Sequence, residues 1–224
     1  MRYPGGKGRC YQQIINVMPP HRVYIEAFLG GGAVIRNKRP AERSIGIDID
    51  PAVIAEWERM RWPGTEWKCV DACEFLSSFA FSGDELVYAD PPYLPHTRRK
   101  PRCYRHDFTS NDHLALLATL KALPCLVILS GYPSRLYDEA LAGWCRLTFT
   151  GTSHVGKRTE ALWLNFSPGE VLHDYRFVGR TFRERDRLRR MAVRWERRLN
   201  QLPPVERQFL LRSLRDRFRL AETQ

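Results

Sequence analysis

The chain has 224 residues, of which 43% are hydrophobic, which suits one domain of moderate size with a short appendage. It contains no run of eighteen apolar residues, and its first residues lack the apolar core of a secretory signal, so we expect a soluble, cytoplasmic protein without a membrane segment. The six cysteines are scattered with no Cys-x-x-Cys pair, which favours reduced thiols and argues against a bound metal.

The net charge of +11 is distributed unevenly. Residues 179–224 hold fourteen arginines and six acidic residues, and residues 94–107 hold five basic residues and one acidic residue. The rest of the chain carries a net charge of −1. A nearly neutral body with two basic segments suits an enzyme that grips a polyanion. Nucleic acid is therefore the leading partner, and an acidic protein or a membrane surface is the alternative.

The first elements lead to a glycine turn. On its residues alone, Tyr3–Lys7 (Tyr-Pro-Gly-Gly-Lys) is a turn with a surface lysine, and a short helix is expected over 10–17. Val23–Ala27 is predicted to be a strand, and Phe28–Gly32 a turn into a helix that begins at Ala33. Glycines let the backbone approach a ligand closely. The spacing differs from Gly-x-Gly-x-x-Gly, so a pyrophosphate site is poorly supported.

Acidic residues end the next two predicted strands. Ser44–Ile47 ends at Asp48, which is placed to accept both ribose hydroxyl hydrogens of a bound nucleoside. Asp50 is explained mainly as the N-cap of a helix over 51–61, with proline as its first residue. Asp71 follows a strand over 67–70 and precedes a helix over 72–79, where an ordinary N-cap is one interpretation.

The strand predicted at Leu86–Ala89 is followed directly by Asp90-Pro91-Pro92-Tyr93. Ligands bind outside the carboxyl ends of strands in open α/β sheets. The Asp90 carboxylate and the Pro91 carbonyl can hold the hydrogens of an exocyclic base amine, and the prolines fix the backbone that carries them. Tyr93 offers a flat face to a base flipped out of its stack. The plainer interpretation is a proline turn after a strand.

Asp-Pro-Pro-Tyr is the catalytic motif of N6-adenine DNA methyltransferases, and residues 1–165 resemble the Dam-type (D12 class) family. The resemblance implies S-adenosylmethionine as methyl donor and a Rossmann-like α/β sheet, mostly parallel with an antiparallel last strand. It also implies a set of cofactor-binding residues: Tyr3 and Lys7 beside the methionine part, Phe28, Gly30 and Gly32 around the adenosyl and methionine parts with Glu26 just upstream, and Asp71 at the adenine amine. Asp50 departs mildly from the family's Asp-Ile-Asn. The family's target-recognition domain has no room between Asp71 and Asp90.

A basic loop follows the tetrapeptide. We interpret five of its residues as phosphate contacts that position nucleic acid, against the alternative of a solvated loop: Arg98, Arg99, Lys100, Arg102 and Arg105. A helix is expected over 111–123 and a strand over 125–129, ending at Ser130-Gly131-Tyr132. Strands over 144–150 and 160–166 are expected to flank a loop over 151–158, which the resemblance turns toward DNA with Lys157 and Arg158.

The tail from Gly179 shows apolar residues at helical spacing on both sides of Leu202-Pro203-Pro204, which predicts an Arg-rich helical hairpin. We therefore expect a methyltransferase domain over 1–178 and a helical extension over 179–224, in a monomer whose hairpin contacts DNA or docks a partner. The predicted function is adenine-N6 methylation of double-stranded DNA by base flipping, as in restriction-modification, without a metal. RNA adenine methylation and a non-catalytic nucleic-acid-binding protein are the alternatives.

Overall fold

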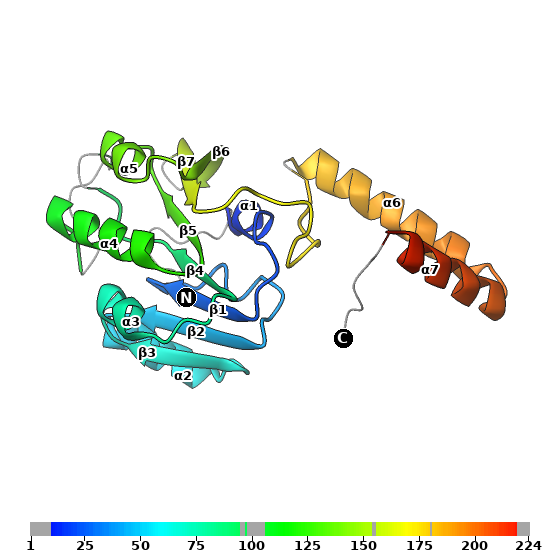
Figure 1. Cartoon of the computed structure of the whole chain (residues 1–224), viewed down its shortest axis with the longest axis horizontal. Helices are drawn as coiled ribbons and strands as arrows, with labels where there is room; N and C mark the ends of the chain where they lie inside the picture. The colour runs from blue at the N-terminus through cyan, green and yellow to red at the C-terminus, as the bar shows by residue number, and fades with distance from the viewer. Residues whose placement is uncertain (1–9, 95–96, 98–105, 154–155, 180, 219–224) are drawn as a thin grey trace. The chain divides into compact units, whose positions relative to one another are not determined.

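A computed structural model describes residues 10–94, 97, 106–153, 156–179 and 181–218, and only the backbone of 152–153 and 156–158. These residues group into two compact units, 1–177 and 178–224. Figure 1 shows the elements of each unit, and each unit is described by itself. No helix in the described ranges is both long and apolar enough to cross a membrane.

The first unit is built on one seven-stranded sheet with the order β3-β2-β1-β4-β5-β7-β6. Its strands are β1 (Val23–Ala27), β2 (Arg43–Asp48), β3 (Thr65–Cys69), β4 (Glu85–Ala89), β5 (Leu126–Gly131), β6 (Cys145–Ser153) and β7 (Gly156–Leu164). Strands β1 to β5 pair in parallel, whereas β7 runs antiparallel to both β5 and β6. The predicted Rossmann-like sheet, mostly parallel with an antiparallel end, is confirmed.

Apolar side chains cover both faces of this sheet, because alternate residues of each strand point to opposite sides. One core contains Ile25 and Val87, packed with residues of α3 (Ala72–Ser78), α4 (Ser110–Ala122) and α5 (Arg135–Ala140). The other contains Tyr24 and Leu86, packed with residues of α1 (Tyr11–Ile15) and α2 (Pro51–Met60). The near-continuous apolar runs of β1, β4 and β5 follow from burial on both faces.

Short polar side chains fix where the helices begin. Asp50 accepts from the Ala52 N–H at α2, and Asp71 accepts from two backbone N–H groups at α3. Thr109 forms a reciprocal capping box with Asp112 at α4. These caps place the helix starts beside the carboxyl ends of the preceding strands. Because the strand order reverses between β1 and β4, this edge carries the crevice expected at a topological switch point.

Two expectations about elements were wrong, and one helix was not predicted. Residues 33–37 form turns and no helix, although the Arg36 N–H donates to the Gly32 carbonyl and the Lys38 N–H to the Val34 carbonyl; the Ile35 N–H donates to the Glu26 carboxylate. The loop expected over 151–158 is mostly strand, since β6 and β7 continue as a hairpin that pairs Ser153 with Gly156. Helix α5 was not predicted, although Ser134 caps it.

The second unit contains α6 (Phe182–Asn200) and α7 (Pro204–Phe218), as the helical spacing predicts. Neither helix has a buried residue. Large apolar side chains therefore remain exposed in this unit, among them Trp195, Phe209 and Phe218.

Candidate active site

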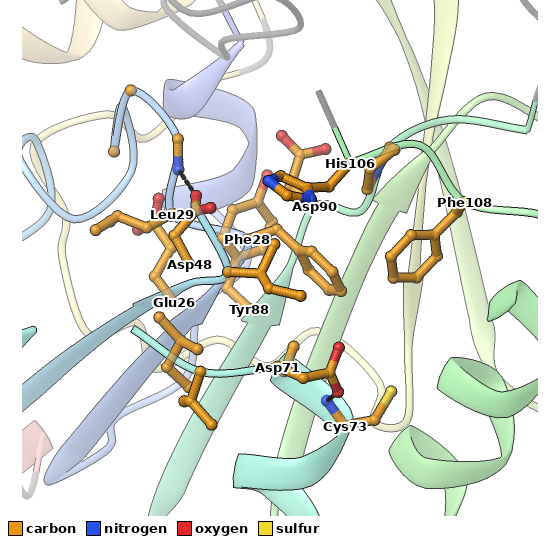
Figure 2. A pocket seen from close by; sticks show the side chains of 18 of the residues that line it. Glu26, Phe28, Leu29, Asp48, Asp71, Cys73, Tyr88, Asp90, His106 and Phe108 are labelled. Atoms are coloured by element: carbon orange, nitrogen blue, oxygen red, sulfur yellow. Dashed lines mark hydrogen bonds between the residues drawn. The ribbon is translucent and has the colours of Figure 1, made fainter. Parts of the chain in front are cut away.

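A pocket of about 440 Å³ lies at the carboxyl ends of β1, β2 and β4 (Figure 2). The glycine turn, the ends of β2 and β3, the start of the tetrapeptide and the entrance to α4 all contribute to its wall. It brings together eight of the predicted site residues: Glu26, Phe28, Gly30, Gly32, Asp48, Asp71, Asp90 and Pro92. The two halves of the predicted site therefore share one cavity.

The glycine turn has a left-handed backbone at three positions, with φ of +63° at Phe28, +45° at Gly30 and +54° at Gly32. A Cβ atom on Gly32 would lie 2.3 Å from Cζ2 of Trp57, which is fully buried. Trp57 Nε1 donates to the Gly30 carbonyl at 3.0 Å, so the indole also holds the turn in place. Glycine is required at position 32 for both backbone conformation and space.

The Asp48 carboxylate fastens the same turn. Its Oδ2 accepts from the Gly30 N–H at 2.8 Å, and its Oδ1 accepts from the Asp50 N–H at 3.0 Å. Burial raises the pKa of Asp48, and these two hydrogen bonds oppose that rise. An ionised carboxylate has about four acceptor sites, so the predicted contact to ribose hydroxyls is compatible with the two bonds observed.

Glu26 and Asp71 stand at other parts of the wall. Glu26 is 3% exposed, and its Oε2 accepts from the Tyr24 hydroxyl at 2.8 Å and from the Ile35 N–H at 2.7 Å. Burial raises the pKa of Glu26 to about 8. Asp71 Oδ1 accepts from the Cys73 N–H at 2.8 Å, so this residue is an N-cap that also lines the pocket. Both interpretations of Asp71 are compatible with that position.

Asp90 is held from the neighbouring strand. Ser130, near the end of β5, donates from Oγ to Asp90 Oδ1 at 2.8 Å, and the Tyr88 hydroxyl lies 3.0 Å from the same Oγ. Ser130 is fully buried, and Asp90 is half-buried. The Ser130 side chain, at the end of the strand expected over 125–129, thus contacts the predicted catalytic carboxylate.

Tyr93 and Pro91 lie away from the pocket wall. Tyr93 is 6% exposed, and its hydroxyl donates to Glu160 Oε2 at 2.8 Å. Its ring meets Tyr132 edge to face, with the ring centroids 4.4 Å apart. A base can stack on Tyr93 only after a face of this ring is uncovered. Pro91 is buried within the tetrapeptide.

Four pocket residues near the end of the basic loop and the start of α4 were not predicted. His106, Asp107, Phe108 and Asp112 line the pocket, and the Phe108 ring lies edge to face against Phe28 at 5.4 Å. The aromatic directly before the Thr109 capping box was the available signal. Several predicted residues lie outside the described part of the chain, some by their side chains only: Tyr3, Lys7, Arg98, Arg99, Lys100, Arg102, Arg105, Lys157 and Arg158.

The chemistry of the wall indicates which ligand fits. Six lining residues carry carboxyl groups, and no lysine or arginine is among the described lining residues. Such a wall disfavours a phosphate group and suits a cationic ligand that carries hydroxyls. Phe28, Ile49, Val70 and Phe108 supply apolar surface for a planar ring. The described residues therefore fit S-adenosylmethionine, which combines a sulfonium, an ammonium, a ribose and an adenine. They include no group of three or more His, Cys, Asp or Glu residues that could hold a metal ion.

The sheet order and the antiparallel β7 are those of a Rossmann-like methyltransferase fold. Residues 3–66 match the family model of the D12 class N6 adenine-specific DNA methyltransferase, which confirms the resemblance over that segment and supports methyltransferase activity with S-adenosylmethionine. No curated protein matches the chain significantly.

Solved structures with similar folds share little sequence with this chain. The N-methyltransferase NodS from Bradyrhizobium japonicum WM9 is 13% identical, with a TM-score of 0.49, over 70% of this chain and 94% of that one. The precorrin 8W decarboxylase of Methanobacterium thermoautotrophicum is 15% identical, with a TM-score of 0.47, over 74% and 94%. The magnesium protoporphyrin IX methyltransferase from Synechocystis PCC 6803, solved with its cofactor bound, is 13% identical, with a TM-score of 0.45, over 70% and 80%.

Proposed function

We propose that the protein transfers a methyl group from S-adenosylmethionine to N6 of an adenine flipped out of double-stranded DNA. The observation that carries the proposal is the shared pocket, in which Asp90 and Pro92 face the same cavity as the glycine turn and Glu26. A family match over residues 3–66 supports the same chemistry. In this proposal the methyl donor and the acceptor amine meet at the carboxyl ends of the parallel strands.

The protein's contribution to the reaction is alignment. When bound, the cofactor supplies an electrophilic methyl group. Asp90 and the Pro91 carbonyl accept hydrogen bonds from the two amine hydrogens, which directs the nitrogen lone pair toward the pocket. Ser130 and Tyr88 hold the Asp90 carboxylate in that orientation. No strong base is needed, because the methylated ammonium loses its proton readily.

The flipped base is proposed to stack on Tyr93. This requires that Tyr132, now in edge-to-face contact with Tyr93, turn away when the base enters. Stacking of a base on an aromatic ring is worth about 1–3 kcal/mol, which offsets part of the cost of extruding the base.

DNA is proposed to be held by basic residues outside the pocket. In α6, Arg183, Arg187, Arg194 and Arg197 are all exposed and recur at intervals that place them along one face of the helix. The basic loop residues proposed as phosphate contacts belong to the same set of positioning groups. Because the interval between Asp71 and Asp90 has no room for a recognition domain, we propose a short or relaxed target sequence.

Incorporation of labelled methyl groups tests this function. The protein is incubated with labelled S-adenosylmethionine and, in parallel, with double-stranded DNA or RNA. We expect label in DNA, and we expect Asp90→Ala to remove it while largely sparing the binding of S-adenosylhomocysteine. Label in RNA alone would contradict the DNA substrate, and turnover retained by Asp90→Ala would contradict the catalytic assignment.

A further inference from the structure

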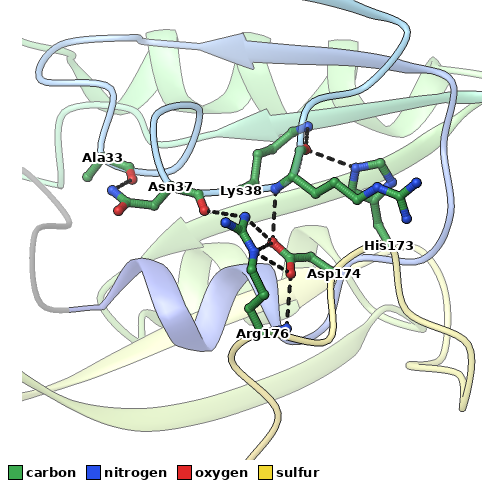
Figure 3. A network of polar contacts seen from close by, with 7 residues as sticks. Ala33, Asn37, Lys38, His173, Asp174 and Arg176 are labelled. Atoms are coloured by element: carbon green, nitrogen blue, oxygen red, sulfur yellow. Dashed lines mark hydrogen bonds and ion pairs between the residues drawn. The ribbon is translucent and has the colours of Figure 1, made fainter. Parts of the chain in front are cut away.

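The segment that follows the glycine turn is fastened to a distant part of the same unit (Figure 3). The Arg39 N–H donates to Asp174 Oδ2 at 2.9 Å, and Arg176 Nη2 donates to the Asn37 carbonyl at 2.8 Å. Arg176 and Asp174 also form an ion pair, in which the Asp174 side chain is only 2% exposed. This strap, residues 172–177, closes over residues 37–39.

Lys38 is buried beneath the strap. The residue is 4% exposed, and its Nζ donates to the Arg39 carbonyl at 2.7 Å. The same ammonium lies 4.3 Å from the centroid of the Tyr24 ring. The Tyr24 hydroxyl donates to Glu26 Oε2 at 2.8 Å, and Glu26 lines the pocket. A continuous path therefore joins the buried ammonium to a carboxylate of the pocket wall.

Burying an ammonium costs free energy because the group loses its hydration, unless neighbouring groups compensate for that loss. A cation over the face of an aromatic ring is attracted to that face and draws electron density from the ring. For a phenol, this strengthens the hydroxyl as a donor, and hydrogen bonds arranged in series reinforce one another. A stronger donor favours the ionised form of its acceptor.

We propose that Lys38 is a positioning residue for the cofactor pocket, which acts through the Tyr24 ring to favour the ionised form of Glu26 toward the ammonium group at the amino-acid end of the methyl donor. The identity of that ligand rests on the proposed function. The role of Lys38 rests on the contacts among these three buried side chains.

The charges around both groups agree with this direction. Burial raises the pKa of Glu26 to about 8 and lowers the pKa of Lys38 to about 8, and each of the two charges opposes the effect of burial on the other. The other titratable or charged groups that act on the pair are Tyr24, Tyr88, Asp90, Asp174, Arg176, His21, His173 and Arg39. Of these, Asp90 disfavours ionisation of Glu26, so Lys38 is the cation that counters it.

The proposal predicts a particular pH dependence. The ammonium group of the ligand binds ionised Glu26 better than neutral Glu26, so the Kd of the unmodified protein falls as pH rises through about 8 while that ammonium stays protonated. Lys38→Met removes the charge while retaining an apolar side chain, which raises the pKa of Glu26 and moves this fall to higher pH. At neutral pH the variant binds on the order of tenfold more weakly. At alkaline pH the affinities converge, because Lys38 itself loses its charge as pH rises through about 8 and Glu26 becomes ionised in both proteins.

Calorimetric titration with S-adenosylhomocysteine from about pH 6 to about pH 9 measures this profile. Tyr24→Phe retains the ring but removes the hydroxyl, so it should shift the profile in the same direction, and Lys38→Met should add less on that background. Lys121→Met, which changes an exposed lysine of α4, is the matched control and should leave the profile unchanged. If Lys38→Met does not fold, Tyr24→Phe carries the same expectation.

The outcomes separate this inference from the proposed function. If the unmodified protein does not bind S-adenosylhomocysteine at any pH, the proposed function is overturned. If it binds, but Lys38→Met has no effect or weakens binding equally at every pH, Lys38 is merely structural and the inference fails. Shifts that simply add in the double variant would overturn the path through Tyr24.

Discussion

Gly32→Ala should destabilise the protein because both the backbone and the available space at this position require glycine. The φ of +54° is left-handed, which costs an alanine about 1 kcal/mol. The new Cβ would also lie 2.3 Å from Cζ2 and 2.7 Å from Cη2 of the fully buried Trp57. Forcing extra volume into a packed core costs about 1–3 kcal/mol, so the expected loss of unfolding free energy is about 2–4 kcal/mol.

Gly64→Ala is the matched control for the backbone term. Its φ is +67°, and a Cβ there meets no atom within 4 Å, so only the cost of about 1 kcal/mol remains. Urea unfolding followed by tryptophan fluorescence measures both variants against the unmodified protein. Equal losses for the two variants would refute the account of a glycine turn packed against Trp57. The same clash should also weaken binding of S-adenosylhomocysteine by Gly32→Ala, because Gly32 lines the pocket.

Three further predictions concern the Asp90 partner, the strap and the arginine face. Ser130→Ala removes the hydroxyl that holds Asp90, so kcat should fall by about tenfold with little change in cofactor affinity; an unchanged kcat in single-turnover assays would contradict that role. Asp174→Asn should cost about 2 kcal/mol of unfolding free energy at neutral pH. Although burial acts in the opposite direction, hydrogen bonds from Arg176 and the Arg39 N–H lower the pKa of Asp174, so this stabilisation is present above its unfolded pKa of about 3.9 and is lost as pH falls through the folded pKa. The difference in urea midpoint between the two proteins should therefore shrink in acid, and a difference that stays constant would argue against the ion pair. Replacing Arg183, Arg187, Arg194 and Arg197 by glutamine should reduce the slope of log affinity for DNA against log salt by about 3–4. Arg59→Gln combined with Arg61→Gln, at the C-terminal end of α2, should leave the slope unchanged. An unaltered slope in the α6 variant would exclude contacts of these arginines with phosphate.

Local patterns were sufficient to predict the parallel part of the sheet and the strand ends that carry the site. Buried strands such as β1 and β4 are short apolar runs, and the residues that follow them are polar, so Asp48 and Asp90 could be placed from order alone. The capping residues Asp50 and Thr109 could also be predicted from the sequence, because a cap depends on only a few neighbouring residues.

Contacts between distant segments could not be predicted in this way. The segment after Ala33 forms turns where a helix was expected, and its Ile35 N–H donates to Glu26, nine positions earlier in the chain. Tyr93 is buried, and its hydroxyl donates a hydrogen bond to Glu160 on β7, which is distant in the sequence. The contact between Asp174 and the Arg39 N–H joins residues 135 positions apart, and no periodic pattern in the sequence predicts such a contact.

In the proposed reaction, the tetrapeptide beginning at Asp90 and the glycine turn act together on the exocyclic amine of adenine. The most direct measurement is mass spectrometry of nucleosides from unmethylated DNA that has been incubated with the protein and S-adenosylmethionine. We expect N6-methyladenine in this DNA and none after incubation with Asp90→Ala. Methylation confined to another base, or no methylated nucleoside from a protein that binds the cofactor, would contradict it.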